Sequence, residues 1–182
     1  MSVRLNRMTT EYNAVEDRIR ISGDTEKGPC IIWLSQRLAQ RLVLELFKWL
    51  ESGPQLVNSD LSPEEKAKQA QKKATPMDQL MAQQSASAAI KPQKSVEVQT
   101  DTEQWLATAV DVKMIPEPDA IYLNFKSQQN HQAHLLLSKP VARQWLAIVH
   151  KGYVTAEWPM TVWPDWFEQA EQKEVSKPSQ LH

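Results

Sequence analysis

Apolar and polar residues alternate in two distant parts of the chain, and each alternating part leads into a helical pattern. The stretches are DRIRISG (Asp17–Gly23) and DAIYLNF (Asp119–Phe125), and their period of two predicts strands with one buried face. A polar turn, an apolar run and an amphipathic stretch follow each of them. When Ser35 is matched to Ser138, the two stretches share nearly the same spacing. The pattern therefore predicts two similar halves of the form strand, turn, strand, helix.

Two amphipathic helices are predicted, at about residues 36–51 and 139–151. Ser35 and Ser138 stand at their N-cap positions, where a hydroxyl accepts from an unpaired amide of the first turn. Gly152 stands where the second helix is expected to end in a left-handed residue. On that helix the residues expected to face inward are Val141, Trp145, Ile148 and Val149, and those expected to face water are Arg143, Gln144 and Lys151.

Further strands are predicted at Arg4–Tyr12 and Trp105–Met114, where the doubled pattern continues. We expect an α+β fold in which antiparallel sheets are built from two similar strand–strand–helix halves with two amphipathic helices. Residues 1–51 are the first half, and residues 100–170 are the second half with a tryptophan-rich C-terminal segment. Both halves are expected to form one globular domain, with residues 171–182 as a flexible tail.

Residues 52–99 have a different composition, dominated by Gln, Lys, Ala, Ser, Glu and Pro. Such a segment buries too little apolar surface to offset the entropy of ordering, so a long disordered polar linker is expected. Two pieces have helix-start signals, LSPEEK from Leu61 and TPMDQL from Thr75. Met77, Leu80 and Met81 form a small apolar cluster in the second piece. This cluster is either part of a transient helix or a docking motif for a protein partner.

The segment TAEWPMTVWPDWFEQAEQ has the strongest aromatic signal in the chain. It holds Trp158, Trp163, Trp166 and Phe167, and Asp165 stands where it would cap a short last helix. One interpretation is that the rings close over the sheet edge or the groove between the helices. A second is that they form a contact surface for a partner or a second copy, because tryptophan is enriched in binding hot spots. A third is that they line a site for a sugar or a proline-containing peptide.

Composition argues against several functional classes. With only four glycines, the chain has neither GxGxxG nor GxxxxGK[ST], so no dinucleotide or phosphate loop is expected. Cys30 is the one cysteine and stands in an apolar run, which favours a small buried side chain over a nucleophile. The N-terminus lacks a signal-peptide pattern, and no apolar run is long enough to span a bilayer. We therefore expect a cytoplasmic protein that does not bind membranes.

No group of residues predicts catalysis, a metal or a cofactor. His131 and His134 lie three apart in a predicted hairpin, which sends their side chains to opposite faces. Asp17 and Asp119 occupy equivalent places before a strand, where aspartate is a common turn residue. We expect a protein that is not an enzyme, although an enzyme without a recognisable motif stays an alternative.

Arg18 and Arg20 lie on one face of a predicted strand and suggest weak binding of single-stranded nucleic acid as a second alternative. Glu11, Glu16 and Asp17 are interleaved with them, and the net charge of the chain is -1. A solvated sheet face with cross-strand ion pairs is the simpler interpretation.

The strands around Ile19–Ile21 and Ile121–Phe125, with the helices after Ser35 and Ser138, give an element order that resembles the globular heads of the DNA end-joining scaffold and centriole-assembly superfamily. That resemblance covers about half of the chain and implies no functional residues, and the long coiled coil that follows the head in that superfamily is not expected here. WLSQRLAQRL (Trp33–Leu42) resembles stretches in bacterial proteins of unknown function, which implies a bacterial source.

Taken together, the sequence favours a non-enzymatic protein-interaction or assembly module. Its partner is expected to be another protein or a second copy of the chain, with Trp158, Trp163, Trp166 and Phe167 as the contact surface.

Overall fold

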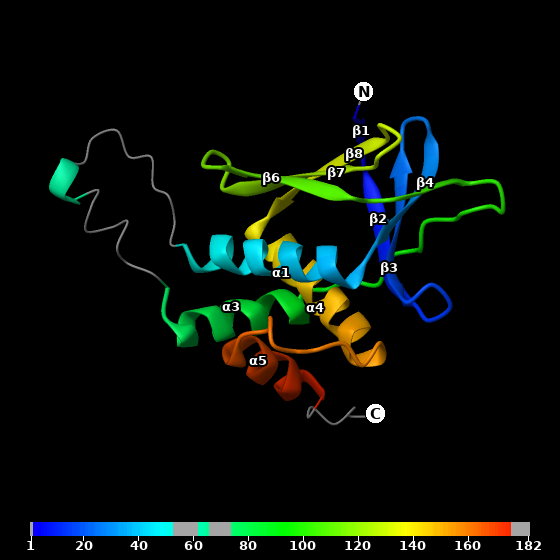
Figure 1. Ribbon diagram of the computed structural model, residues 1–182. Coiled ribbons are helices and arrows are strands. Elements are labelled where there is room, and N and C mark those ends of the chain that lie inside the picture. The colour runs from blue at the N-terminus through cyan, green and yellow to red at the C-terminus, as the bar shows by residue number, and fades with distance from the viewer. Residues whose placement is uncertain (1, 53–61, 66–73, 176–182) are drawn as a thin grey trace.

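The computed structural model describes residues 2–52, 62–65 and 74–175. Two four-stranded sheets lie on one side of helices α1 (Gln36–Glu51) and α4 (Lys139–Thr155) (Figure 1). Helices α3 (Pro76–Ala88) and α5 (Asp165–Val175) lie farther from the sheets. The α+β class predicted from the sequence is confirmed.

Each half of the chain contributes three antiparallel strands and one of the two central helices. In the first half, β2 (Arg7–Asn13), β3 (Arg18–Thr25) and β4 (Gly28–Leu34) lead into α1. In the second half, β6 (Ala109–Ile115), β7 (Ala120–Lys126) and β8 (Gln132–Ser138) lead into α4. The alternation of apolar and polar residues in the sequence therefore corresponds to the inward and outward faces of these strands.

The two halves exchange their first strands, which the sequence did not predict. β1 (Val3–Arg4) pairs in parallel with β8, and β5 (Glu103–Leu106) pairs in parallel with β4. The sheet orders are β1-β8-β7-β6 and β2-β3-β4-β5. The strands predicted as Arg4–Tyr12 and Trp105–Met114 are each interrupted by two residues, because the chain crosses there from one sheet to the other.

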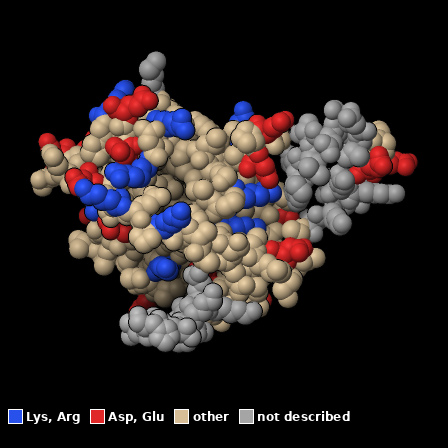
Figure 2. Space-filling model, turned by 180° about the vertical axis from the view of Figure 1, so that it is seen from behind, with Lys and Arg blue, Asp and Glu red and all other residues tan. Residues whose placement is uncertain are grey.

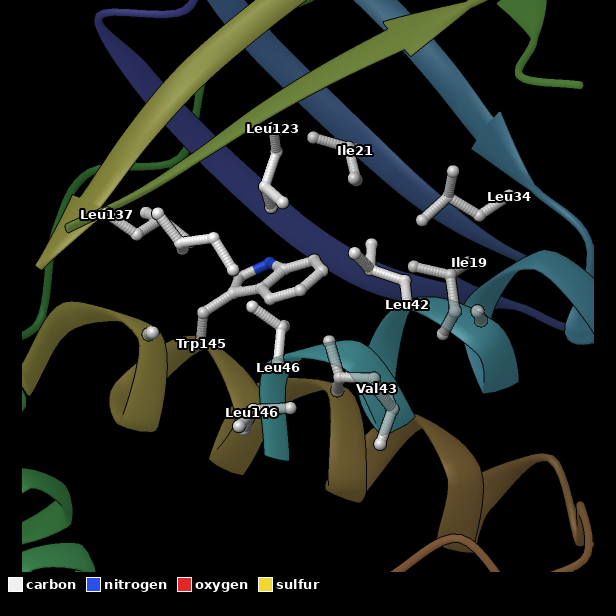
Figure 3. Close-up of a cluster of buried hydrophobic side chains, with 14 of the residues drawn as sticks. Ile19, Ile21, Leu34, Leu42, Val43, Leu46, Leu123, Leu137, Trp145 and Leu146 are labelled. Atoms are coloured by element: carbon white, nitrogen blue, oxygen red, sulfur yellow. The ribbon is translucent and has the colours of Figure 1, made fainter. Parts of the chain in front are cut away.

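The core lies where both sheets meet α1 and α4. Figure 3 shows Ile21 and Leu34 from one sheet and Leu123 and Leu137 from the other, with the Trp145 ring between the strands and the helices. Ile21 and Leu123 are fully buried and Leu34 is 1% exposed. One hydrophobic cluster thus includes residues of both halves, as expected for one folding unit.

Helix α4 continues past Gly152 instead of ending there. A Cβ atom at Gly152 would lie 3.0 Å from Ile19 Cδ1 and 3.5 Å from Tyr12 Cβ, so the glycine serves the close approach of α4 to the first sheet. The left-handed residue after the helix is Glu157, with φ 55°. The predicted end at Gly152 is wrong, because a glycine at a close contact and a glycine at a helix end look alike in sequence.

Both predicted N-cap serines occupy their positions, but only one of them makes a capping hydrogen bond. Ser35 accepts from Leu38 N at 3.4 Å and caps α1. Ser138 occupies the N-cap position of α4, but its side chain makes no capping hydrogen bond. Pro140 follows in the first turn of α4, where its missing N–H costs no helical bond.

The prediction that residues 52–99 are one disordered linker is wrong for residues 74–99. Helix α3 starts at a capping box, in which Asp78 N donates to Thr75 Oγ1 and Thr75 N donates to Asp78 Oδ2. It packs on α4 and α5 through buried glutamines, and hydrogen bonds to these side chains replace the apolar contacts that the composition lacks. Residues 53–61 and 66–73 lie outside the described residues.

The boundary predicted for a flexible tail at residue 171 is also corrected. Helix α5 continues to Val175, and Ala170 on it is 1% exposed. The remainder of that predicted tail, residues 176–182, lies outside the described residues.

Candidate functional site, a groove between β2, β8 and α4

A groove with a volume of about 480 Å³ opens beside β2, β8 and α4. Its fourth wall is the segment 90–95, which follows α3 and has no regular secondary structure. We call this cavity the α4 groove. Val96, only 6% exposed, anchors the end of that segment, and its N–H donates to Thr9 Oγ1 at 2.8 Å. On the opposite side, Trp145 Nε1 donates to Thr10 Oγ1 at 2.9 Å and fixes α4 to β2.

The α4 groove has an apolar lining that remains open to solvent. Four aliphatic side chains contribute to it and stay more than a third exposed, namely Ile90 (36%), Leu136 (48%), Val141 (44%) and Ile148 (38%). Val141 and Ile148 were predicted to face inward, and this is wrong, since the sheets cover a narrower part of α4 than its apolar stripe offers. Trp145 and Val149 are buried as predicted.

The charges at the α4 groove have one sign. Among the described residues, its lining includes Arg7, Lys91 and Lys94 and contains no Asp, Glu, His or Cys. Arg7 lies 3.8 Å from Asp24, and Lys94 lies 2.5 Å from Glu97, so these two cations have acidic neighbours outside the lining. No such ion pair involves Lys91 among the described residues. The groove therefore presents positive charge beside exposed aliphatic surface.

The lining follows the chain residue by residue along two of its walls. Residues 5–10 and residues 90–95 both line the groove without a gap. Since one face of a strand presents only alternate residues, a continuous run means that the groove lies along the backbone of β2. β2 is an edge strand, paired only with β3 in its sheet. An edge strand keeps alternate N–H and C=O groups for a further strand.

The aromatic residues predicted as a contact surface lie inside the protein. Trp158, Trp163 and Trp166 are 5–7% exposed and Phe167 is fully buried. Phe47 of α1 packs edge-on against Trp163, Trp166 and Phe167, with ring centroids 5.5–5.6 Å apart. These rings join α5 and the preceding loop to α1 and α4, so they form no exposed contact surface in this structure. These rings are buried because of their large apolar area, and a protein core buries such area as readily as an interface does.

The apolar cluster predicted on α3 is divided between the core and the surface. Leu80 is 7% exposed, whereas Met77 and Met81 are 63% and 62% exposed. Gln79 Nε2 donates to Leu50 O at 3.0 Å, and Gln83 Nε2 donates to Arg143 O at 3.1 Å. Arg143, predicted to face water, is 6% exposed because α3 covers it.

Arg18 and Arg20, the residues of the nucleic-acid alternative, are both paired with glutamates. Arg18 lies 3.5 Å from Glu16, and Arg20 lies 3.1 Å from Glu11 and over the ring of Trp33. Figure 2 shows Lys and Arg gathered on the side of the molecule where β2–β4 lie, with Asp and Glu among them. Nucleic-acid binding through this face has no further support and stays a prediction.

Ser127, His131 and Glu103 lie in a Ser–His–Glu arrangement, but the serine hydroxyl is hydrogen-bonded to the backbone of its own turn. Ser127 Oγ lies 3.1 Å from His131 Nδ1, and His131 Nε2 lies 3.4 Å from Glu103. Ser127 Oγ also accepts from the backbone N–H groups of Gln129 and His131, which fixes the turn between β7 and β8. His134, expected on the other face, contacts Ser2 at 2.9 Å instead.

The remaining candidate residues have separate surroundings. Asp17 accepts from Tyr12 Oη at 2.8 Å and Trp158 Nε1 at 3.0 Å, while Asp119 lies 3.1 Å from Lys139. Burial, with the nearby Glu103 charge, raises the pKa of the Cys30 thiol to about 11, so the thiolate that reacts as a nucleophile is scarce at neutral pH. Within residues 2–52, 62–65 and 74–175, no group of three or more His, Cys, Asp or Glu side chains is placed to hold a metal ion.

The α4 groove was not predicted from the sequence, although one signal for it was present. The run of three leucines in β8, Leu135–Leu137, cannot point all of its side chains to one face. Leu135 and Leu137 are buried, so Leu136 between them faces outward into the groove. The exposure of Val141 and Ile148 had no such signal.

No family model, curated protein or solved structure matches the chain. The resemblance to scaffold heads therefore stays a prediction. Among the described residues, no helix has the length and apolar character needed to cross a membrane.

Proposed function

We propose that this protein is a non-enzymatic interaction module that binds an extended segment of a partner protein in the α4 groove. The bound segment carries aliphatic and acidic side chains. The observation that carries this proposal is the lining itself, in which exposed aliphatic residues stand beside Arg7, Lys91 and Lys94 with no carboxylate.

The shape of the groove supports an extended occupant. Two walls are stretches of six consecutive residues, 5–10 and 90–95. Residues 7–10 of the first wall belong to β2, and at about 3.3 Å per residue this part of the strand spans roughly 13 Å. An extended peptide next to an edge strand gains main-chain hydrogen bonds from it, and side pockets select its side chains. Leu136, Val141 and Ile148 offer the apolar contacts on the opposite wall.

The chemistry of the lining supports binding more than reaction. A general acid, a general base or a strong nucleophile is most often His, Asp, Glu or Cys, and the lining contains none of these. Arg7, Lys91 and Lys94 of the lining are instead suited to pair with carboxylates of a bound segment, as complementary charges do at interfaces.

The test is a fluorescence-polarisation titration with two labelled octapeptides, one alternating Leu with Glu and one alternating Leu with Lys. The acidic peptide is expected to bind. The basic peptide is expected to bind at least about tenfold more weakly, because Arg7, Lys91 and Lys94 repel its lysines. Lys91→Glu with Lys94→Glu should reverse this preference. Ile148→Ser should weaken both peptides, since it removes aliphatic contact area.

Lys151→Glu is the matched control, because Lys151 is exposed on the same helix but does not line the groove. Binding by this variant should equal that of the unchanged protein. Equal binding of both peptides would show that the α4 groove is not the binding site. An equal loss of peptide affinity in Lys151→Glu and in the variants of Lys91, Lys94 and Ile148 would show the same.

A further inference from the structure

The outer strands of the two sheets differ in what covers them. β2 is flanked by α4 and by the segment ending at Val96, and the α4 groove lies open between them: Trp145 Nε1 donates to Thr10 Oγ1, and Val96 N donates to Thr9 Oγ1. β6 takes the equivalent place at the edge of the other sheet. Among the described residues, the side-chain hydrogen bonds and ion pairs of β6 join Asp111 to Lys126 and Asn124, both of the neighbouring strand β7.

The residues of β6 make it an unprotected edge. It runs for seven residues, AVDVKMI, without proline. Val110 and Val112 pack in part against the core, while Met114 on the same face remains 40% exposed. Natural proteins shield an apolar edge with a covering segment, a bulge, charged side chains or a partner strand, because its free N–H and C=O groups recruit another strand. β6 has two charged residues, Asp111 and Lys113, and their charges are opposite.

The sequence of β6 is complementary to itself in one antiparallel register. When two copies pair about Val112, Asp111 of each copy lies opposite Lys113 of the other, and Val110 lies opposite Met114. Opposite charges directly across a strand pair are stabilising and like charges are destabilising. Pairing about Asp111 or Lys113 would instead place two identical charges opposite each other. Registers shifted by one residue would turn the core face of one copy toward the outer face of the other.

We propose that β6 is a homodimer interface, in which β6 of one copy pairs antiparallel with β6 of a second copy about Val112. The two four-stranded sheets then form one continuous sheet across the interface. Met114 loses its exposed surface against Val110 of the second copy, and two Asp111–Lys113 pairs fix the register. This interface is separate from the α4 groove, whose lining includes no residue of β6.

The experiment is sedimentation velocity on the full chain over a range of concentrations, with two charge-reversal variants. Lys113→Glu and Asp111→Lys each place like charges at both cross-strand pairs, so each alone should raise the dimer dissociation constant by about tenfold or more. An equimolar mixture of the two variants restores opposite charges at both pairs. That mixture should form a heterodimer as tight as the unchanged dimer.

Lys113 is solvent-exposed and no described residue pairs with it, so Lys113→Glu keeps the fold, and an unchanged far-UV circular dichroism spectrum checks this. Octapeptide binding by Lys113→Glu should be unchanged, so a failure here is distinct from a failure of the groove proposal. A monomeric unchanged protein at all concentrations would overturn the interface. So would a dimer that both variants leave intact, or a mixture that stays monomeric.

Discussion

Arg143 of α4 is a buried cation that contacts both α3 and α5. Its guanidinium bonds to Gln79 Oε1 and, at 3.5 Å, to Gln79 O, and it lies 5.7 Å from the centre of the Trp166 ring. No described carboxylate pairs with it. Desolvation lowers the pKa of Arg143 to about 10, so it remains charged at neutral pH. Amide dipoles and a ring face thus compensate this charge.

Replacing Arg143 by Ala should destabilise the protein by about 2–3 kcal/mol, because Gln79 Oε1 would be left buried without its donor. Urea unfolding followed by circular dichroism measures the free energy of unfolding. Arg37→Ala, at an exposed position on α1, should change it by no more than about 0.5 kcal/mol. Equal effects of both changes would show that Arg143 does not hold α3 in place.

His150 gives the protein a pH dependence with a defined sign. Burial lowers the pKa of His150 below 6.5, with Lys151 adding to this and Glu168 and Glu171 opposing it. Below pH 6.5 the unfolded chain therefore takes up a proton that the folded state does not, and stability is lost as the pH falls. The melting temperature should decrease between pH 7.5 and 5.5.

His150→Leu should reduce that dependence, because Leu has no proton to bind. Scanning calorimetry of both proteins at several pH values measures the slope. An equally steep slope in the variant would assign the effect to other groups.

The side chains of α4 show which buried and exposed residues can be predicted from the sequence and which cannot. The apolar period correctly identified Trp145 and Val149 as buried. It gave the wrong direction for Arg143, because α3 covers this side chain. The polar composition of α3 does not indicate that it packs against α4. The apolar period failed for Val141 and Ile148 because no element covers that part of the helix, and the groove is formed by this absence of cover.

At the scale of elements, the contact between α4 and β3 depends on the missing side chain of Gly152. An alanine in a helix is favoured over glycine by up to about 1 kcal/mol, but here its Cβ would lie 3.0 Å from Ile19 Cδ1. Ile19→Val removes that methyl group. Gly152→Ala should therefore be more favourable, by about 1 kcal/mol, in the Ile19→Val protein than in the unchanged one.

Urea unfolding of the four proteins in this double-mutant cycle gives the coupling free energy. Additive effects of the two changes would mean that α4 and β3 adjust without mutual contact at this point.

Elements with a long periodic pattern were predictable, and short or polar ones were not. The alternation around Ile19 and Ile121 correctly placed β3 and β7. β1 has two residues and β5 has four, and each pairs with a strand of the other half, so no local pattern indicates their exchange. Helix α3 was identified as a helix start at Thr75, but its docking depends on hydrogen bonds that only the folded structure shows.

At the scale of the whole molecule, neither half has a complete sheet or core without the other. β4 lacks β5, and β8 lacks β1, until both halves are present. Fragments 1–56 and 57–182 should therefore be unfolded when made separately. Produced together, they should co-purify through a tag on one of them and unfold in a single transition.

Circular dichroism of the separate fragments provides the comparison. A separate fragment with a cooperative unfolding transition would contradict the shared core.

The strand exchange also sets the order of events during synthesis. β1 leaves the ribosome early, but its partner residues in β8 follow about 130 positions later in the chain. At translation rates of about 5–20 residues per second, this delay lasts roughly 7–26 s. Until the second half has been made, β1 has no partner strand and the apolar face of the first half has no second sheet to pack against, so it is a surface that chaperones recognise.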